Sequence, residues 1–178
     1  EKYDRELEDI FDLQDEITSR VVLRIRPELE RIEFKRAQAK TQETMDAWDM
    51  FQKGRWTLYS SAGGLAESVN WFELAEKADD DYVDATALKV SVAVAANFLF
   101  MKSYDIKADY EKLERLRVHD PENDLIHAGM GAYLNYGLKK PDEALTLFES
   151  AIELNPTNMM AQRYYVQCLI WISRPQDA

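Results

Sequence analysis

Residues 138–156, LKKPDEALTLFESAIELNP, contain the spacing that decides the fold of this chain. Small Ala144 is followed after four residues by Phe148, after three more by Ala151, and after five more by Pro156. On a helix the first three residues share one face. The two alanines let a second helix approach closely, and Phe148 fills the space between the helices. Pro156 prevents the helix from continuing, so the stretch predicts a closely packed helix that ends just before it.

The same spacing occurs once more, further upstream, at Ser68, Phe72, Ala75 and Asp80. A glycine precedes each group, Gly54 by 14 residues and Gly131 by 13, where the first helix of a pair needs a small residue. The pattern resembles the tetratricopeptide repeat, in which two helices recur about every 34 residues. The resemblance implies an all-α, tetratricopeptide-like helical-repeat solenoid. We expect seven to nine helices and no sheet, because no segment alternates apolar and polar residues for long enough.

The intermediate and final repeats are less regular. Leu113, Leu116 and Pro121 repeat the end of the pattern, but Pro121 lies 41 residues after Asp80. The middle unit is therefore expected to contain a longer first helix and a loop around residues 101–108. The last residue, Ala178, lies 34 residues after Ala144, so we expect a truncated fourth unit after about three full ones in residues 45–178. The start without methionine suggests a piece of a larger protein.

Residues 1–44 are expected to form an amphipathic helical segment followed by a linker. Apolar residues recur every three or four positions through residues 10–32, which is typical of one face of a long helix. They are Leu13, Ile17, Val21, Ile25, Leu29 and Ile32. Because Pro27 lacks an amide donor, we expect a break in the helix near Arg26. The polar stretch 34–44 is expected to lead into the repeats.

Composition excludes several classes of function. The net charge of -11 would repel a phosphate backbone, so nucleic acid is not expected as a partner. Cys168 is the only cysteine, which rules out a disulfide within the chain and favours a buried core residue. No apolar run approaches the roughly 20 residues that span a bilayer. We therefore expect a cytoplasmic protein without membrane insertion by this segment.

Neither a catalytic site nor a cofactor or metal site is predicted. The aspartates at 79–81 and 84 lack the glycine and glutamate of a calcium-binding loop. The two histidines are not at metal-ligand spacing, and the serines and glycines between residues 60 and 64 match no nucleophile or phosphate-binding motif. The residues of these patterns are Asp79, Asp80, Asp81, Asp84, His119, His127, Ser60, Ser61, Gly63 and Gly64.

Residues 3–59 resemble a known family. The ordered motifs are YDRELEDIFDLQDEITSRVV, PELERIEFKRAQAK and ETMDAWDMFQKGRWTLY. They are similar to the carboxy-terminal region of bacterial class III adenylate cyclase-like and TolB-like-domain regulatory proteins. The resemblance implies a sensory or scaffolding segment of a multidomain signalling protein, in which a separate upstream domain carries any nucleotide chemistry.

We expect the repeats to bind a protein or peptide segment in a concave groove lined by their first helices. The expected groove residues are Trp48, Phe51, Arg55, Asp84, Ala87, Ser91, Leu125, Ala128, Ala132, Met160, Arg163 and Gln167. Arg55 and Arg163 are expected to pair with carboxylates of the partner. Two alternatives remain: a homodimer formed through the helix at residues 10–32, and a small-molecule sensor with a pocket between repeats. An enzyme is the weakest hypothesis.

Overall fold

The computed structural model describes residues 10–60, 64–100 and 104–173, and their regular structure is entirely helical. No β-strand occurs in these ranges, as the absence of alternating sequence predicted. The elements in chain order are α1 (Ile10–Gln38), the 3₁₀ helix η2 (Gln42–Thr44), α2 (Ala47–Ser60), α3 (Gly64–Ala78), α4 (Val83–Phe100), α5 (Lys107–His119), α6 (Asp124–Ala132), the π-helix η3 (Tyr133–Gly137), α7 (Pro141–Leu154) and α8 (Met159–Ser173).

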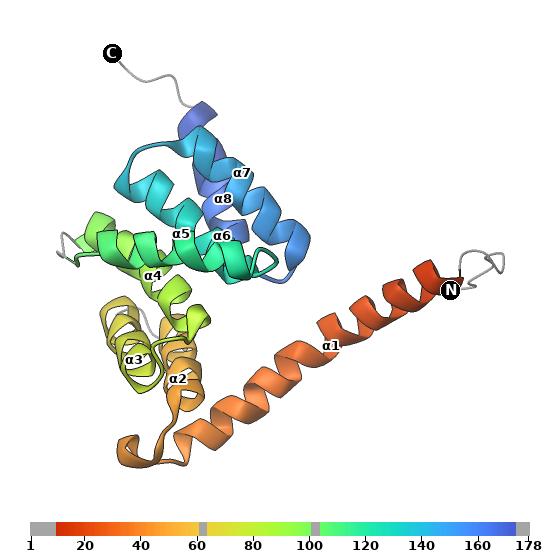
Figure 1. Ribbon diagram of the computed structural model, residues 1–178, viewed down its shortest axis with the longest axis vertical. Helices are drawn as coiled ribbons and strands as arrows, with labels where there is room; N and C mark the ends of the chain where they lie inside the picture. The colour runs from red at the N-terminus through yellow and green to blue at the C-terminus, as the bar shows by residue number, and fades with distance from the viewer. Residues whose placement is uncertain (1–9, 61–63, 101–103, 174–178) are drawn as a thin grey trace.

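Helices α2 to α8 stack as successive pairs, and α1 extends away from them (Figure 1). Each helix packs against the next along the chain, and α4 and α6 also pack against the first helix of the following unit. The pairs are α2 with α3, α4 with α5, and α6 with α7, after which α8 follows alone. This arrangement confirms the all-α, tetratricopeptide-like solenoid.

A glycine facing a phenylalanine ring holds two of these pairs together. Phe148 of α7 is completely buried, and a Cβ atom added to Gly131 would lie 2.6 Å from its ring. Phe72 of α3 is equally buried, and a Cβ atom at Gly54 would lie 2.6 Å from it. The phenylalanine ring of one helix therefore occupies the space that the glycine of the other helix leaves free. This contact explains why the spacing identified in the sequence predicts the fold.

The middle pair begins with a longer helix, as the spacing predicted. Helix α4 has 18 residues, whereas α2 has 14. Lys89 of α4 is largely buried and forms ion pairs with Glu76 of α3 and Asp109 of α5, the latter at 2.9 Å. Buried charges are tolerated only when they are paired, so this cluster fixes α4 between its two neighbours.

The break expected near Arg26 is wrong, because α1 is one continuous helix of 29 residues that includes Pro27. A proline inside a helix removes one backbone hydrogen bond and crowds the preceding turn, at a cost of about 3 kcal/mol. Here 17 helical residues precede Pro27 and 11 follow it, so the hydrogen-bond ladders on both sides remain long enough to continue the element.

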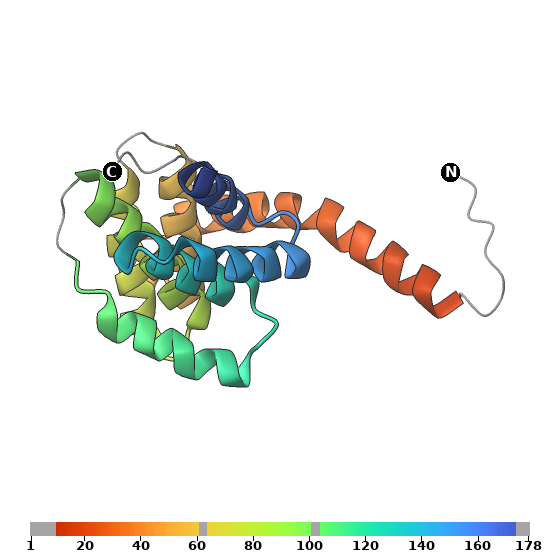
Figure 2. The same cartoon turned by 90° about the horizontal axis from the view of Figure 1, so that it is seen from above.

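The carboxyl-terminal end of α1 is anchored on α2. Phe34 and Ala37 are buried, and the Phe34 ring stacks on the Trp56 ring with centroids 4.0 Å apart. Residues 34–38 of the polar stretch that leads into the repeats thus still belong to the helix. The rest of α1 projects from the helical stack, as both orientations of the ribbon show (Figure 2).

Adding a single methyl group at Gly131 is expected to destabilise the protein. The substitution Gly131→Ala places Cβ against the Phe148 ring and should lower the free energy of unfolding by about 1–3 kcal/mol. In the double variant Gly131→Ala/Phe148→Leu the smaller side chain makes room for the methyl group. Chemical denaturation should therefore show a coupling of at least about 0.5 kcal/mol between the two substitutions. Additive effects would show that the ring is not the group that excludes a side chain at position 131.

Candidate protein-binding groove

A cavity of about 930 Å³ lies between α1 and the first helices of the repeats. One wall is made by Val22, Ile25, Leu29 and Glu33 of α1. The opposite wall comes from α2, from the amino-terminal turns of α4 and α6, and from the segment that enters α8. Its residues are Trp48, Phe51, Arg55, Tyr59, Asp84, Leu88, Asp124, Leu125, Asn155, Thr157, Asn158, Met159, Met160 and Gln162.

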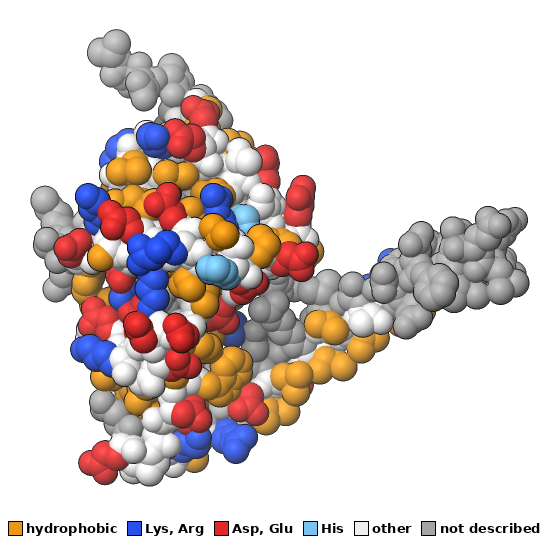
Figure 3. All heavy atoms as spheres, in the orientation of Figure 1, with side chains coloured by type: hydrophobic (Ala, Val, Ile, Leu, Met, Phe, Trp, Pro, Cys, Tyr) orange, Lys and Arg blue, Asp and Glu red, His pale blue; other side chains and the backbone are white. Residues whose placement is uncertain are grey.

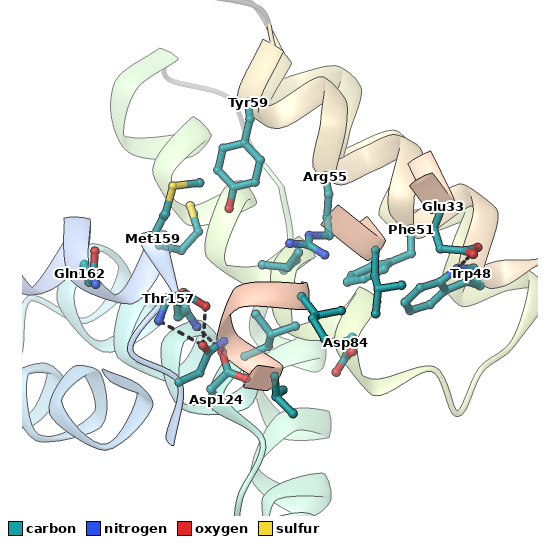
Figure 4. Close-up of a pocket in the computed structure, with 18 residues that line it drawn as sticks. Glu33, Trp48, Phe51, Arg55, Tyr59, Asp84, Asp124, Thr157, Met159 and Gln162 are labelled. Carbon is teal, nitrogen blue, oxygen red and sulfur yellow. Dashed lines mark hydrogen bonds between the residues drawn. The ribbon is translucent and has the colours of Figure 1, made fainter. Parts of the chain in front are cut away.

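Both walls of this groove present apolar side chains to solvent. On α1, Val22 and Leu29 are each 55% exposed, and on the opposite side Trp48 is 42% exposed and Met159 56% exposed. Figure 4 shows Trp48, Tyr59 and Met159 arranged around the hollow. Concentrated exposure of large apolar groups in one depression is typical of an interaction site.

One polar contact connects the two walls. The indole nitrogen of Trp48 donates a hydrogen bond of 3.4 Å to a carboxylate oxygen of Glu33 (Figure 4). The Trp48 ring also lies against Phe51, with ring centroids 6.0 Å apart. Phe51 itself is buried and forms part of the groove floor. The orientation of the exposed tryptophan is therefore set from both sides.

The polar part of the groove is built from an aspartate and an asparagine of successive repeats. Asn123 caps α6, because its Oδ1 accepts hydrogen bonds from the amides of Leu125 at 3.0 Å and Ile126 at 3.2 Å. Its Nδ2 then donates to Asp84 Oδ1 of α4 at 2.9 Å. The Asn123 side chain thus accepts hydrogen bonds from free amides at the start of α6 and also binds the Asp84 carboxylate of the preceding unit.

The same arrangement recurs one repeat later. Asn158 Oδ1 accepts from the amide of Ala161 at 3.0 Å, and its Nδ2 donates to Asp124 Oδ2 at 2.7 Å. Asn155 Nδ2 donates to the same oxygen at 2.8 Å. The aspartate and its asparagine are 39 residues apart in the first case and 34 in the second. We call these two contacts the Asp–Asn ladder; it holds the first helices in a fixed relation along the groove.

The groove has an excess of negative charge. Its lining includes three carboxylates, on Glu33, Asp84 and Asp124, and one guanidinium, on Arg55. Burial raises the pKa of the Asp84 carboxyl above its usual range, and the nearby carboxylates of Asp124 and Asp120 raise it further. The hydrogen bond from Asn123 and the charge of Arg55 oppose this effect. A cationic group entering the groove would relieve the repulsion between the carboxylates.

The structure brings together about half of the expected groove residues. Trp48, Phe51, Arg55 and Leu125 line one cavity, as do Asp84 and Met160. These residues lie on four different first helices, α2, α4, α6 and α8. The Arg55 guanidinium lies 5.8 Å from the centroid of the Phe51 ring.

Other expected groove residues do not reach the cavity. Ala128 and Ala132 are completely buried, as are Ala87 and Ser91. Ala87 and Ala128 lie three residues after Asp84 and Leu125, which turns their side chains by about 60° around the helix, so they face the neighbouring helices. The small side chains at these positions allow the neighbouring helices to pack closely. Arg163 is exposed but outside the cavity, and Gln167 is bound by the hydroxyl of Tyr136.

Two features of the groove were not identified from the sequence. The first is the α1 wall, since residues 1–44 were treated separately from the repeats. Its apolar face was recognised, but a repeat period cannot show where a helix outside the repeat packs. The second is the Asp–Asn ladder, although the separation of each pair, close to one repeat, was a detectable signal.

Within the described ranges, no group of three or more His, Cys, Asp or Glu side chains is arranged to hold a metal ion. No helix in those ranges has both the length and the apolar character needed to cross a membrane. Cys168 is buried, and its thiol donates to Asn135 Oδ1 at 3.4 Å. The lining of the groove combines apolar side chains with carboxylates, amides, hydroxyls and one guanidinium.

No protein-family model matches the chain, and no curated protein sequence matches it. Among solved structures, that of MamA MSR-1 C2 is similar, with a TM-score of 0.45 and 16% sequence identity. The alignment covers 83% of this chain and 87% of that chain. The fold assignment rests on the helix pairs and glycine–phenylalanine contacts described above. The resemblance of residues 3–59 to cyclase-like and TolB-like-domain proteins stays a prediction.

Replacing Asp84 by asparagine is expected to stabilise the protein at neutral pH. Because its pKa is raised, the folded state binds a proton more tightly than the unfolded state, and stability is lost as pH rises through the folded-state pKa. Asp84→Asn removes the charge but keeps an oxygen that accepts from Asn123. The melting temperature should exceed that of the parent protein at pH 7, and the difference should close as pH falls toward about 4.

The matched control is Asp84→Ala, which removes both the charge and the acceptor for Asn123. We expect no comparable gain from it, since the asparagine amide then loses its partner in the ladder. A pH-independent difference between Asp84→Asn and the parent protein would contradict the assignment of a raised pKa.

Proposed function

We propose that this protein binds a segment of another protein chain in the groove between α1 and the first helices of the repeats. The observation that carries the proposal is the pair of apolar walls that face each other across a cavity of about 930 Å³. A segment lying between two walls buries apolar surface on both of its sides, which is favourable by about 25 cal/mol per Å². No catalytic role is proposed, and the fold by itself specifies architecture only.

The chemistry of the walls defines the class of segment. Apolar side chains at helical spacing would contact α1 on one side and residues such as Trp48 and Leu125 on the other. Lysine or arginine side chains at its edges would face the carboxylates of Glu33, Asp84 and Asp124. We therefore expect an amphipathic segment with a positive net charge.

A small molecule is the second candidate ligand. The cavity volume lies within the range of roughly 300–1,000 Å³ that is usual for ligand pockets. The same contacts would then select an apolar cation. In either case the family resemblance suggests the wider role: binding at this groove would report to a regulatory or cyclase-like domain elsewhere in the parent protein.

Two synthetic helical peptides test the proposal directly. Both carry leucines at positions i, i+3, i+4 and i+7, but one has flanking lysines and the other has flanking glutamates. The lysine peptide should bind, and the glutamate peptide should bind at least about tenfold more weakly, which corresponds to about 1.4 kcal/mol. Fluorescence anisotropy of the labelled peptides measures both affinities. Equal affinities would exclude the carboxylates as determinants.

Trp48 is expected to contribute most to peptide binding, because it is a large, oriented and partly exposed aromatic side chain. Trp48→Ala should weaken binding of the lysine peptide by at least about tenfold, or 1.4 kcal/mol, with little effect on thermal stability. Val118→Ala on α5 is the control, since Val118 is 76% exposed and lies outside the cavity. If both variants bind as the parent does, the peptide occupies another surface.

Photocrosslinking from positions 48 and 118 can identify the natural partner. A photoreactive phenylalanine analogue at position 48 should form covalent adducts with a partner in the cells that express the protein. The same analogue at position 118 should not. Adducts at both positions in equal yield would indicate nonspecific contact.

A further inference from the structure

A second cavity, of about 220 Å³, lies beside the π-helix η3 and shares no lining residue with the groove. Its walls come from the end of α4, through Val94 and Phe98, and from η3, through Tyr136 and Gly137. Lys139, which follows η3, also lines this cavity and is exposed to solvent. We call the cavity the Lys139 pocket. It combines apolar walls with one charged side chain, which is the usual composition of a site for a small ligand.

The backbone at Lys139 has a conformation that lysine rarely adopts. Its φ angle is 58°, and no other non-glycine residue in the described ranges has a positive φ. A glycine usually occupies such a position after a helix, because a Cβ atom crowds the backbone there. Residues held in sparsely populated conformations are concentrated at binding and catalytic sites. The strain at Lys139 therefore directs attention to what its side chain contacts.

Aromatic rings hold the Lys139 ammonium in place. Its nitrogen lies 4.7 Å from the centroid of the Phe98 ring and 6.0 Å from that of the Trp171 ring. The Phe98 and Trp171 centroids are 5.4 Å apart, and the Tyr136 ring lies 5.3 Å from the first and 5.4 Å from the second. An ammonium over the face of an aromatic ring is attracted by the ring quadrupole. The rings thus position the cation without using a carboxylate.

The uncharged polar side chains of the Lys139 pocket already have partners. The Asn97 amide donates to the Tyr104 carbonyl at 3.0 Å and accepts from the Tyr104 amide at 2.9 Å. The Tyr136 hydroxyl donates to Gln167. Among the side chains that line the pocket, the Lys139 ammonium is therefore the polar group left to contact a ligand.

A lysine without a carboxylate partner is unexpected on an acidic chain. The net charge is -11, and Figure 3 shows basic side chains lying among acidic ones on one face of the molecule. The neighbouring Lys140, for example, forms an ion pair of 2.8 Å with Glu143. Lys139 forms no ion pair with a carboxylate within the part of the chain that the structure describes. Its charge is available to an anion from outside the chain.

We infer that the Lys139 pocket is a second binding site, and that its ligand joins a small apolar group to a carboxylate. The carboxylate pairs with the Lys139 ammonium, and the apolar group contacts Val94, Phe98 and Ile106. A cavity of about 150 Å³ is enough to hold benzene, so about 220 Å³ admits one phenyl ring or a branched aliphatic group. Free acids of this size and the carboxyl-terminal residue of a peptide share this chemistry.

Amide NMR spectra of the whole chain, recorded during titration with phenylacetate, test the inference. The amides of Gly137 and Lys139 should shift, with half-saturation at about 1 mM for a ligand of this size. Phenylacetamide has the same ring without the charge, and 2-phenylethylamine reverses the charge. Each should bind at least about tenfold more weakly than phenylacetate.

Substitutions at position 139 separate the ammonium from the backbone. Lys139→Met keeps a long side chain without the charge and should weaken phenylacetate binding at least about tenfold. Lys139→Gly should weaken it equally, although glycine adopts the positive φ without strain. Lys139→Arg keeps a cation and should bind nearly as the parent does. Lys140→Met is the matched control, since Lys140 is an exposed neighbouring lysine that does not line the pocket.

Two short peptides that end in phenylalanine identify the source of the carboxylate. If the peptide with a free carboxyl terminus shifts the same amides, chain ends are ligands as well as free acids; if phenylacetate alone does so, the ligand is a free acid. The amidated peptide should not bind in either case.

Several results would overturn the inference. They are the absence of shifts at Gly137 and Lys139 up to the solubility limit of phenylacetate, equal binding of phenylacetamide, and unchanged binding by Lys139→Met. Loss of binding in Lys140→Met would also contradict it. Amide spectra that match those of the parent protein outside the pocket show that the variants fold.

Discussion

Two phenylalanine rings set the distance between paired helices, and the rest of the structure depends on that distance. Phe72 and Phe148 each occupy the space that a glycine leaves on the partner helix, and an added Cβ atom would lie 2.6 Å from either ring. Protein interiors are packed nearly as densely as organic crystals, so such a contact permits little displacement. The rigid stack that results can hold side chains of four different first helices around one cavity.

The groove depends on this stack in two ways. Each first helix begins at the same edge of the solenoid, so its first turn can contribute a side chain, as Asp84 and Asp124 do. The Asp–Asn ladder then ties each start to the next unit through Asn123 and Asn158. Polar groups that are capped and paired in this way do not need water or a ligand to be satisfied. The groove is therefore preformed, which lowers the entropic cost of binding.

Helix α1 adds what the repeats alone lack. Without it the first helices would present a single apolar surface, whereas α1 supplies a second wall through Val22, Ile25 and Leu29. It is held on α2 by Phe34 and projects for most of its length. The same helix thus borders the groove and carries exposed apolar side chains, such as Ile17 and Val21, along its projecting part.

The sequence by itself determined the helical class, the pairing of helices and the positions of the two buried phenylalanines. The reason is that the spacing of Ala144, Phe148 and Ala151 is a local property of one helix and its neighbour. The continuity of α1 through Pro27, the burial of Ala128, and the wall that α1 adds to the groove were decided only by the tertiary structure. Each depends on how far a helix is rotated and on what packs against it from outside the repeat. Those relations are set by the summed packing of many side chains, which a period in the sequence does not encode.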